Sequence, residues 1–128
     1  MLRDLIICCD GGAVPLPLDT ETLVREARAR WGAQATHLPG VTERVELRLD
    51  IAADGPGYYI TVLRSFDSIN LDGTYEQNVE TAVWLRSLMP SDAPAVVAFD
   101  SGYTAKVPLR PGMTADEFNG EVRRALLA

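Results

Sequence analysis

The chain has 128 residues, the length of a single domain, and 47% of them are hydrophobic, enough for a core without disulfides or metals. Its net charge of −6 predicts a surface that repels nucleic-acid phosphates and anionic lipid headgroups, so binding to either is not expected. No apolar run approaches the roughly 20 residues of a membrane-spanning helix.

The N-terminal third predicts one strand and one helix. Residues 3–11 form a compact apolar run that ends in Asp-Gly-Gly, and its length suits a buried strand. Acidic residues and the adjacent Cys8 and Cys9 make this run a poor signal peptide, so we expect a cytoplasmic protein with reduced thiols. A helix is predicted to begin at Asp19 or Thr20, because apolar residues then recur at helical spacing until a glycine stops the pattern.

The middle of the chain predicts an antiparallel hairpin followed by a helix. Apolar and polar residues alternate strictly over 44–51, which indicates a strand with one face on the core and the other in solvent. A turn containing Gly and Pro leads to a second strand at 58–66. The helix is expected from about Thr74 to Met89, since it starts with a capping box and Pro90 follows it.

The C-terminal third predicts two strands and a helix. Residues 95–100 and 103–109 form the strands, and Pro108 places the end of the second one near a sheet edge. The last helix follows a capping box of Thr114 and Glu117.

The order of these elements defines the fold class. It reads β-α-β-β-α-β-β-α, in which two hairpins and three helices make a single α+β domain over residues 1–128. We expect a sandwich with a mostly antiparallel sheet packed with three helices.

An acidic loop before the second helix raises the question of a metal site. Residues 68–73 match the first half of a calcium-binding loop, but Ser68 stands where the leading carboxylate belongs. Glu80 lies one residue too late to be the bidentate ligand. Thr74 and Gln77 instead form a helix-capping box, so the loop is predicted to cap a helix and to bind no metal.

Side chains for nucleophilic or acid–base chemistry are few. His37 is the only histidine, and it lies in a segment expected to be a loop. A Cys9–His37 pair is conceivable, but Cys9 lies in an apolar strand, where burial makes a thiol inert. Asp67, Asp72 and Asp100 follow strands and could meet at one end of a sheet, yet chance proximity is expected in so acidic a chain. We expect no catalytic residue, no metal and no cofactor.

The second predicted helix carries apolar residues on two sides. Tyr75 and Val79 belong to the face assigned to the core, with Leu85 at its margin. Trp84 and Leu88, four residues apart, fall largely opposite that face. Either a neighbouring helix or loop covers them, or they form an exposed anchor pair for a partner, since Trp is enriched at binding hot spots.

The C-terminal part of the chain carries a resemblance to known families. About a third of the chain, Gly73 to Phe118, reads GTYEQNVETAVWLRSLMPSDAPAVVAFDSGYTAKVPLRPGMTADEF, a capped helix, a strand, a hairpin ending in LRPGMT and a closing helix. With the size and acidity, this order resembles the immunity proteins encoded beside bacterial polymorphic toxins. Type III secretion chaperones are also small and acidic, but they start with a helix, whereas this chain starts with a strand.

The resemblance implies a protein without enzyme activity that neutralises a cognate toxin by occlusion. Acidic side chains would steer a basic toxin domain to the surface, where a few apolar anchors would hold it. The candidate contact residues are Asp67, Asn70, Asp72, Trp84 and Leu88. The alternatives are a chaperone-like acidic binding protein, or a small enzyme or ligand-binding domain with a pocket between sheet and helices.

Overall fold

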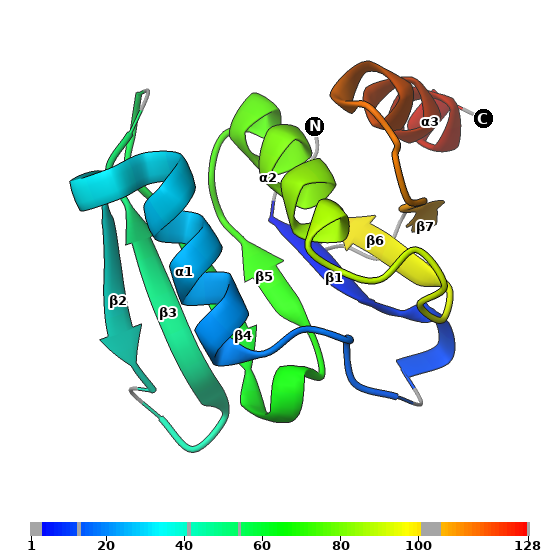
Figure 1. The fold of residues 1–128 in the computed structure, drawn as a ribbon. Coiled ribbons are helices and arrows are strands. Elements are labelled where there is room, and N and C mark those ends of the chain that lie inside the picture. Colours follow the sequence, from blue (N-terminus) through cyan, green and yellow to red (C-terminus); the bar gives the residue numbers. More distant parts are fainter. Residues whose placement is uncertain (1–3, 13, 41, 54, 101–105, 128) are drawn as a thin grey trace.

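The computed structural model describes residues 4–12, 14–40, 42–53, 55–100 and 106–127 (Figure 1). Within these ranges the helices are α1 (Thr20–Trp31), α2 (Tyr75–Ser87) and α3 (Ala115–Leu127). The strands are β1 (Leu5–Cys9), β2 (Ala35–Pro39), β3 (Val45–Ile51), β4 (Tyr58–Leu63), β5 (Ile69–Leu71), β6 (Val96–Asp100) and β7 (Lys106–Pro108). They form one sheet in the order β2-β3-β4-β5-β1-β6-β7, and all neighbouring strands are antiparallel. The predicted α+β sandwich is confirmed.

Two of these strands lie in segments that the sequence predicts as loops, and there the prediction is wrong. β2 contains His37 and pairs with β3 at one edge of the sheet. β5 has three residues and lies between β4 and β1, where Ile69 and Leu71 are fully buried. Both strands are short and lack a long alternating pattern, so their conformation depends on backbone hydrogen bonds to strands that are distant in sequence.

The helix starts follow the local signals in the sequence. α1 begins after Asp19, whose carboxylate accepts a hydrogen bond from the N–H of Thr22 at 2.8 Å. α1 ends at Trp31, and the next residue, Gly32, has a φ of 59° that favours glycine. The predicted capping boxes open the other two helices, with Thr74 and Gln77 before α2 and Thr114 and Glu117 before α3.

The helices form a layer over one face of the sheet (Figure 1). α1 lies over β2 and β3, α2 lies beside it over the middle strands, and α3 packs against α2 and β7. Leu85, predicted at the margin of the core, is fully buried, and the polar residues Asn78 and Thr81 of α2 are buried too. α2 is enclosed by α1, α3 and the sheet. More of its circumference is therefore buried than the single apolar face expected from helical periodicity. No described helix is long and apolar enough to cross a membrane.

Candidate functional site

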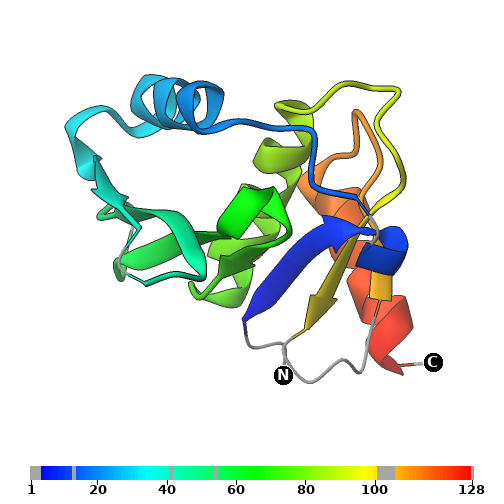
Figure 2. The ribbon, with the colours of Figure 1, turned by 90° about the horizontal axis from the view of Figure 1, so that it is seen from below.

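The two faces of the sheet differ in composition and in what covers them. Alternate residues of a strand point to opposite faces, and the register aligns Leu5 with Leu71 and Ile6 with Asn70. Leu5 and Leu71 face the helices and are buried in the core. The other face carries mostly half-buried and exposed side chains, although Thr61 and Val97 on it are buried, and no helix of the described part of the chain lies over it (Figures 1 and 2). We call this the open face; it includes Ile6, Arg48, Tyr59, Thr61 and Asn70.

A groove of about 710 Å³ runs along the open face over β3, β4 and β5. Ile6 and Leu63 form part of its apolar lining, and Arg48, Thr61 and Asn70 are among its polar residues. The ring of Tyr59 also lines the groove; this residue is 38% exposed, and among the large hydrophobic residues of the described ranges only Val14 is more exposed. An exposed aromatic ring within a mixed groove is typical of a surface that another molecule covers.

Arg48 is held in place by neutral groups. Its Nε donates a hydrogen bond to the hydroxyl of Thr61 at 3.2 Å, and its guanidinium carbon lies 5.2 Å from the centroid of the Tyr59 ring. Within the described ranges no carboxylate lies within 4.0 Å of this guanidinium. Arg48 is therefore oriented before any ligand binds, and its remaining N–H groups can donate to carbonyl or carboxylate oxygens of a partner.

The predicted residues Asn70 and Asp72 line the groove, but both also have structural roles. Asp72 accepts a hydrogen bond from the backbone N–H of Tyr59 at 2.7 Å, which fixes the end of β5 against β4. The amide of Asn70 donates to Asp4 at 3.4 Å across β5 and β1. Asp67 lies at the opposite end of β5 from Asp72 and is exposed.

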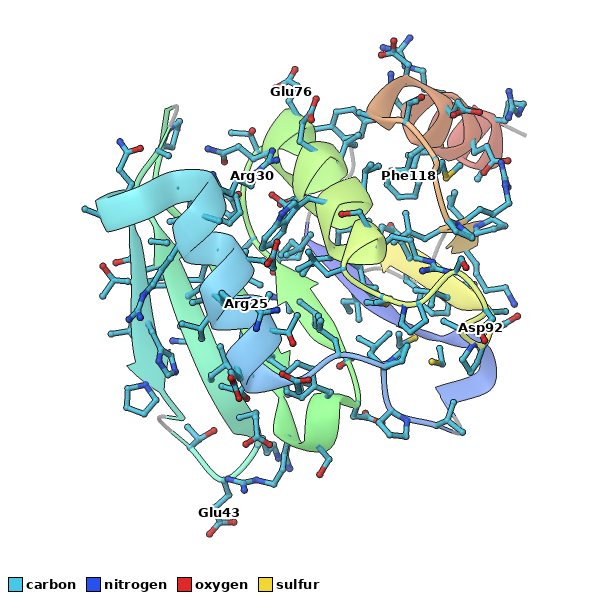
Figure 3. All side chains as sticks on the ribbon, viewed as in Figure 1. Arg25, Arg30, Glu43, Glu76, Asp92 and Phe118 are labelled. Carbon is cyan, nitrogen blue, oxygen red and sulfur yellow. The ribbon has the colours of Figure 1, made fainter. Side chains whose placement is uncertain are left out.

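The other two predicted residues lie in the helical layer. The ring centroids of Trp84 and Trp31 are 4.8 Å apart at an interplanar angle of 67°, and Arg30, labelled in Figure 3, stacks over both rings. Of the two explanations for Trp84, the structure supports coverage by a neighbouring helix, here α1. Leu88 is half-buried against the core at the end of α2. The five candidate residues therefore do not share one surface.

The conceivable catalytic groups are dispersed. Cys9 lies in β1 and His37 in β2, with β3, β4 and β5 between them, so they cannot form a pair. Burial raises the pKa of the Cys9 thiol, which keeps it protonated and unreactive. Asp67 and Asp72 lie at opposite ends of β5, so they do not gather with Asp100 at one end of the sheet. The described residues contain no group of three or more His, Cys, Asp or Glu placed to hold a metal ion.

Sequence reasoning missed the groove although part of its signal was present. The alternation over 44–51 placed Arg48 on the face opposite the core, and Tyr59 alternates in the same way with its buried neighbours Tyr58 and Ile60. What the sequence lacked was the position of α3, which leaves this whole face without a helix. Comparisons with protein-family models, with curated proteins and with solved structures found no match to this chain.

Proposed function

We propose that this protein binds another protein through the open face, as an immunity protein that neutralises a cognate bacterial toxin by occlusion. The supporting observation is the groove, in which an exposed Tyr59 lies against an Arg48 that is oriented without a carboxylate. Tyr and Arg are the residue types, with Trp, that dominate binding hot spots. A toxin bound across this sheet face would have its active site covered by the immunity protein.

Electrostatics would act at two ranges in this complex. The net charge of −6 would attract a basic toxin domain over several ångströms and raise the association rate. At contact, Arg48 would donate to carbonyl or carboxylate oxygens at the centre of the interface. In this proposal the protein works in the cytoplasm of a bacterium, where it meets the toxin before the toxin reaches its target.

The proposal is tested with the product of the open reading frame adjacent to this one. Co-expression should protect cells from that product, and titration calorimetry should give a 1:1 complex. Tyr59→Ala and Arg48→Ala should each weaken binding by about 2 kcal/mol, which is roughly 30-fold in Kd. Both side chains lie on the sheet surface, so the variants should remain folded.

Trp84→Phe is the matched control, because it keeps an aromatic ring between α1 and α2 and lies in the helical layer. Its affinity should equal that of the unmodified protein. Normal binding by both open-face variants together with loss of binding in Trp84→Phe would assign the contact to the helical layer. Absence of both complex and protection would refute the immunity proposal.

A small-ligand site is the second candidate, and the volume of the groove favours it. About 710 Å³ lies within the roughly 300–1,000 Å³ range of small-molecule pockets. Screening a fragment library by NMR would separate the two candidates. A fragment that binds the groove should shift the NMR resonances of Thr61 and Asn70 in a saturable way. If its affinity exceeds that of the adjacent gene product, the result would support ligand binding over partner binding.

A further inference from the structure

A buried arginine lies far from the open face, at the end of α2. Arg86 is only 4% exposed, and no other arginine in the described ranges is buried. Its Nε donates to the carbonyl of Leu109 at 3.1 Å, and its Nη1 donates to the carbonyls of Pro90 at 3.1 Å and Met89 at 3.5 Å. These bonds join the C-terminal end of α2 to the segment after β7.

The acceptors of Arg86 are neutral, so its charge has no counter-ion within the described part of the chain. No carboxylate there lies within 4.0 Å of the guanidinium, and no hydrogen bond from Nη2 is found. Burying a charge without an opposite charge is costly, and burial accordingly lowers the pKa of Arg86. An anion placed beside Nη2 would offset this cost.

Arg86 lines a cavity that has room for such an anion. The cavity has a volume of about 230 Å³ and is lined by Ser91, residues 93–95, the start of β6 and the segment 108–111. Since a water molecule takes about 30 Å³ of liquid, the space suits a carboxylate with a few waters. Because Nε and Nη1 are bound to carbonyls, Nη2 is the part of the guanidinium left to contact a ligand.

The other charged side chains at the cavity are neutralised in pairs. Asp10 accepts from Lys106 at 3.2 Å, and Arg110 donates to both carboxylate oxygens of Glu121 at 2.9 and 3.1 Å. Asp10 would repel an anion if it stood alone, but its ion pair with Lys106 reduces that repulsion. Arg86 is therefore the one unbalanced charge among the described residues that line the cavity.

We propose that this cavity binds a carboxylate, from a small organic acid or from a peptide C-terminus, against Nη2 of Arg86. The site is independent of the open face and of the proposed function. Hydrogen bonds from a guanidinium to a carboxylate are charge-assisted, and the low exposure of Arg86 strengthens them.

The test is an NMR titration of the full chain with sodium acetate against sodium chloride at equal ionic strength. Acetate should shift the Nε–Hε resonance of Arg86 and the amides of residues 91–97 in a saturable way, and chloride should not. Ala95→Phe narrows the cavity at an exposed position and should weaken acetate binding at least tenfold with the fold intact. Arg86→Lys should have a similar effect, and Arg25→Lys, at an exposed arginine on α1, should have none.

A tripeptide with a free C-terminal carboxylate and its C-terminal amide distinguish the two sources of the ligand. Tighter binding of the free tripeptide than of acetate would assign a peptide terminus, and equal binding would assign a small acid. The proposal would be overturned by equal binding of the amide, by equal shifts with chloride, or by undiminished binding in Ala95→Phe. If Arg86→Lys does not fold, the proposal is judged by acetate binding to Ala95→Phe and by the shift of the Arg86 Nε–Hε resonance in the unmodified protein.

Discussion

At the scale of single residues, Asn78 holds the acidic loop before α2 against the start of that helix. Its side chain is fully buried; Oδ1 accepts from the N–H of Gly73 at 2.9 Å, and Nδ2 donates to the carbonyl of Gly73 at 3.3 Å. A side chain at position 73 would also collide with Gln77, because a Cβ there would lie 2.7 Å from the Gln77 Oε1. The loop is therefore closed by protein groups that start the helix.

Replacement of Asn78 by Ala should lower the free energy of unfolding by about 1–3 kcal/mol, because both Gly73 backbone groups lose a partner in a part-buried site. Urea unfolding followed by circular dichroism measures this change. Glu80→Ala, at an exposed position on the same helix, is the control and should change stability little. Equal stability of the two variants would show that the Asn78 bonds do not hold the loop.

At the scale of secondary-structure elements, the two edges of the sheet are protected in the same way. At the β2 edge, the N–H of Ala52 donates to the carbonyl of Gln34 at 2.9 Å. Antiparallel ladders alternate, so residues 36 and 38 bond to β3 and the backbone groups of residues 37 and 39 point away from the sheet. Pro39 has no N–H to offer there, so this edge lacks a donor that an additional strand would need.

The β7 edge follows the same rule. The N–H of Leu109 donates to the carbonyl of Val96 at 2.8 Å, which places the missing N–H of Pro108 on the outer side. Lys106 on the same strand adds a charge at this edge. Prolines at both edges therefore disfavour edge-to-edge association of the sheet.

Pro39→Thr restores a donor to the β2 edge and should promote self-association. A two-fold pairing would gain one hydrogen bond from each chain, about 2 kcal/mol in total or roughly a 30-fold lower dimer Kd. Sedimentation velocity over a range of concentrations measures this constant. Pro94→Thr, at an exposed proline outside the strands, should behave like the unmodified protein. If Pro39→Thr also self-associates no more than the unmodified protein, Pro39 does not protect the β2 edge.

At the scale of the whole molecule, titrating groups set limits to stability on both sides of neutral pH. The backbone N–H of Thr22 donates a hydrogen bond to Asp19, and the backbone N–H of Thr114 donates one to Glu117; these bonds hold the pKa of each carboxyl below its usual range. The two carboxylates therefore contribute to the free energy of unfolding at pH values above the ordinary carboxyl pKa. This contribution is lost as pH falls through their pKa in the folded state. Burial raises the pKa of the Cys8 and Cys9 thiols, so their contribution is present at neutral pH and is lost as pH rises through the folded-state value.

We expect the urea midpoint to be highest between about pH 5 and 8 and to fall on both sides. In the double variant Asp19→Asn and Glu117→Gln, the caps remain but no longer titrate, so the fall below about pH 4 should be smaller. In Cys8→Ala with Cys9→Ala, the fall above about pH 8.5 should be smaller. If the urea midpoints of the unmodified protein and of both double variants fall equally at low and at high pH, other groups cause the pH dependence.

The sequence by itself determined the elements whose signals are local. The three helices begin at caps made by residues within three positions of each other, and the alternation over 44–51 gave β3 its core face. The fold class followed from the order of those elements. Such signals are readable because the atoms that satisfy one another are neighbours in the chain.

Only the tertiary structure decided the features that depend on distant pairing. The strand conformation of β2 and β5 required partners elsewhere in the chain, and the two tryptophans met because α1 packs beside α2. Placement of all three helices on one face exposed the groove at Tyr59, and the return of the chain at Leu109 buried Arg86. Burial and long-range hydrogen bonds are properties of the assembled chain, because each is set by which segments come to lie together.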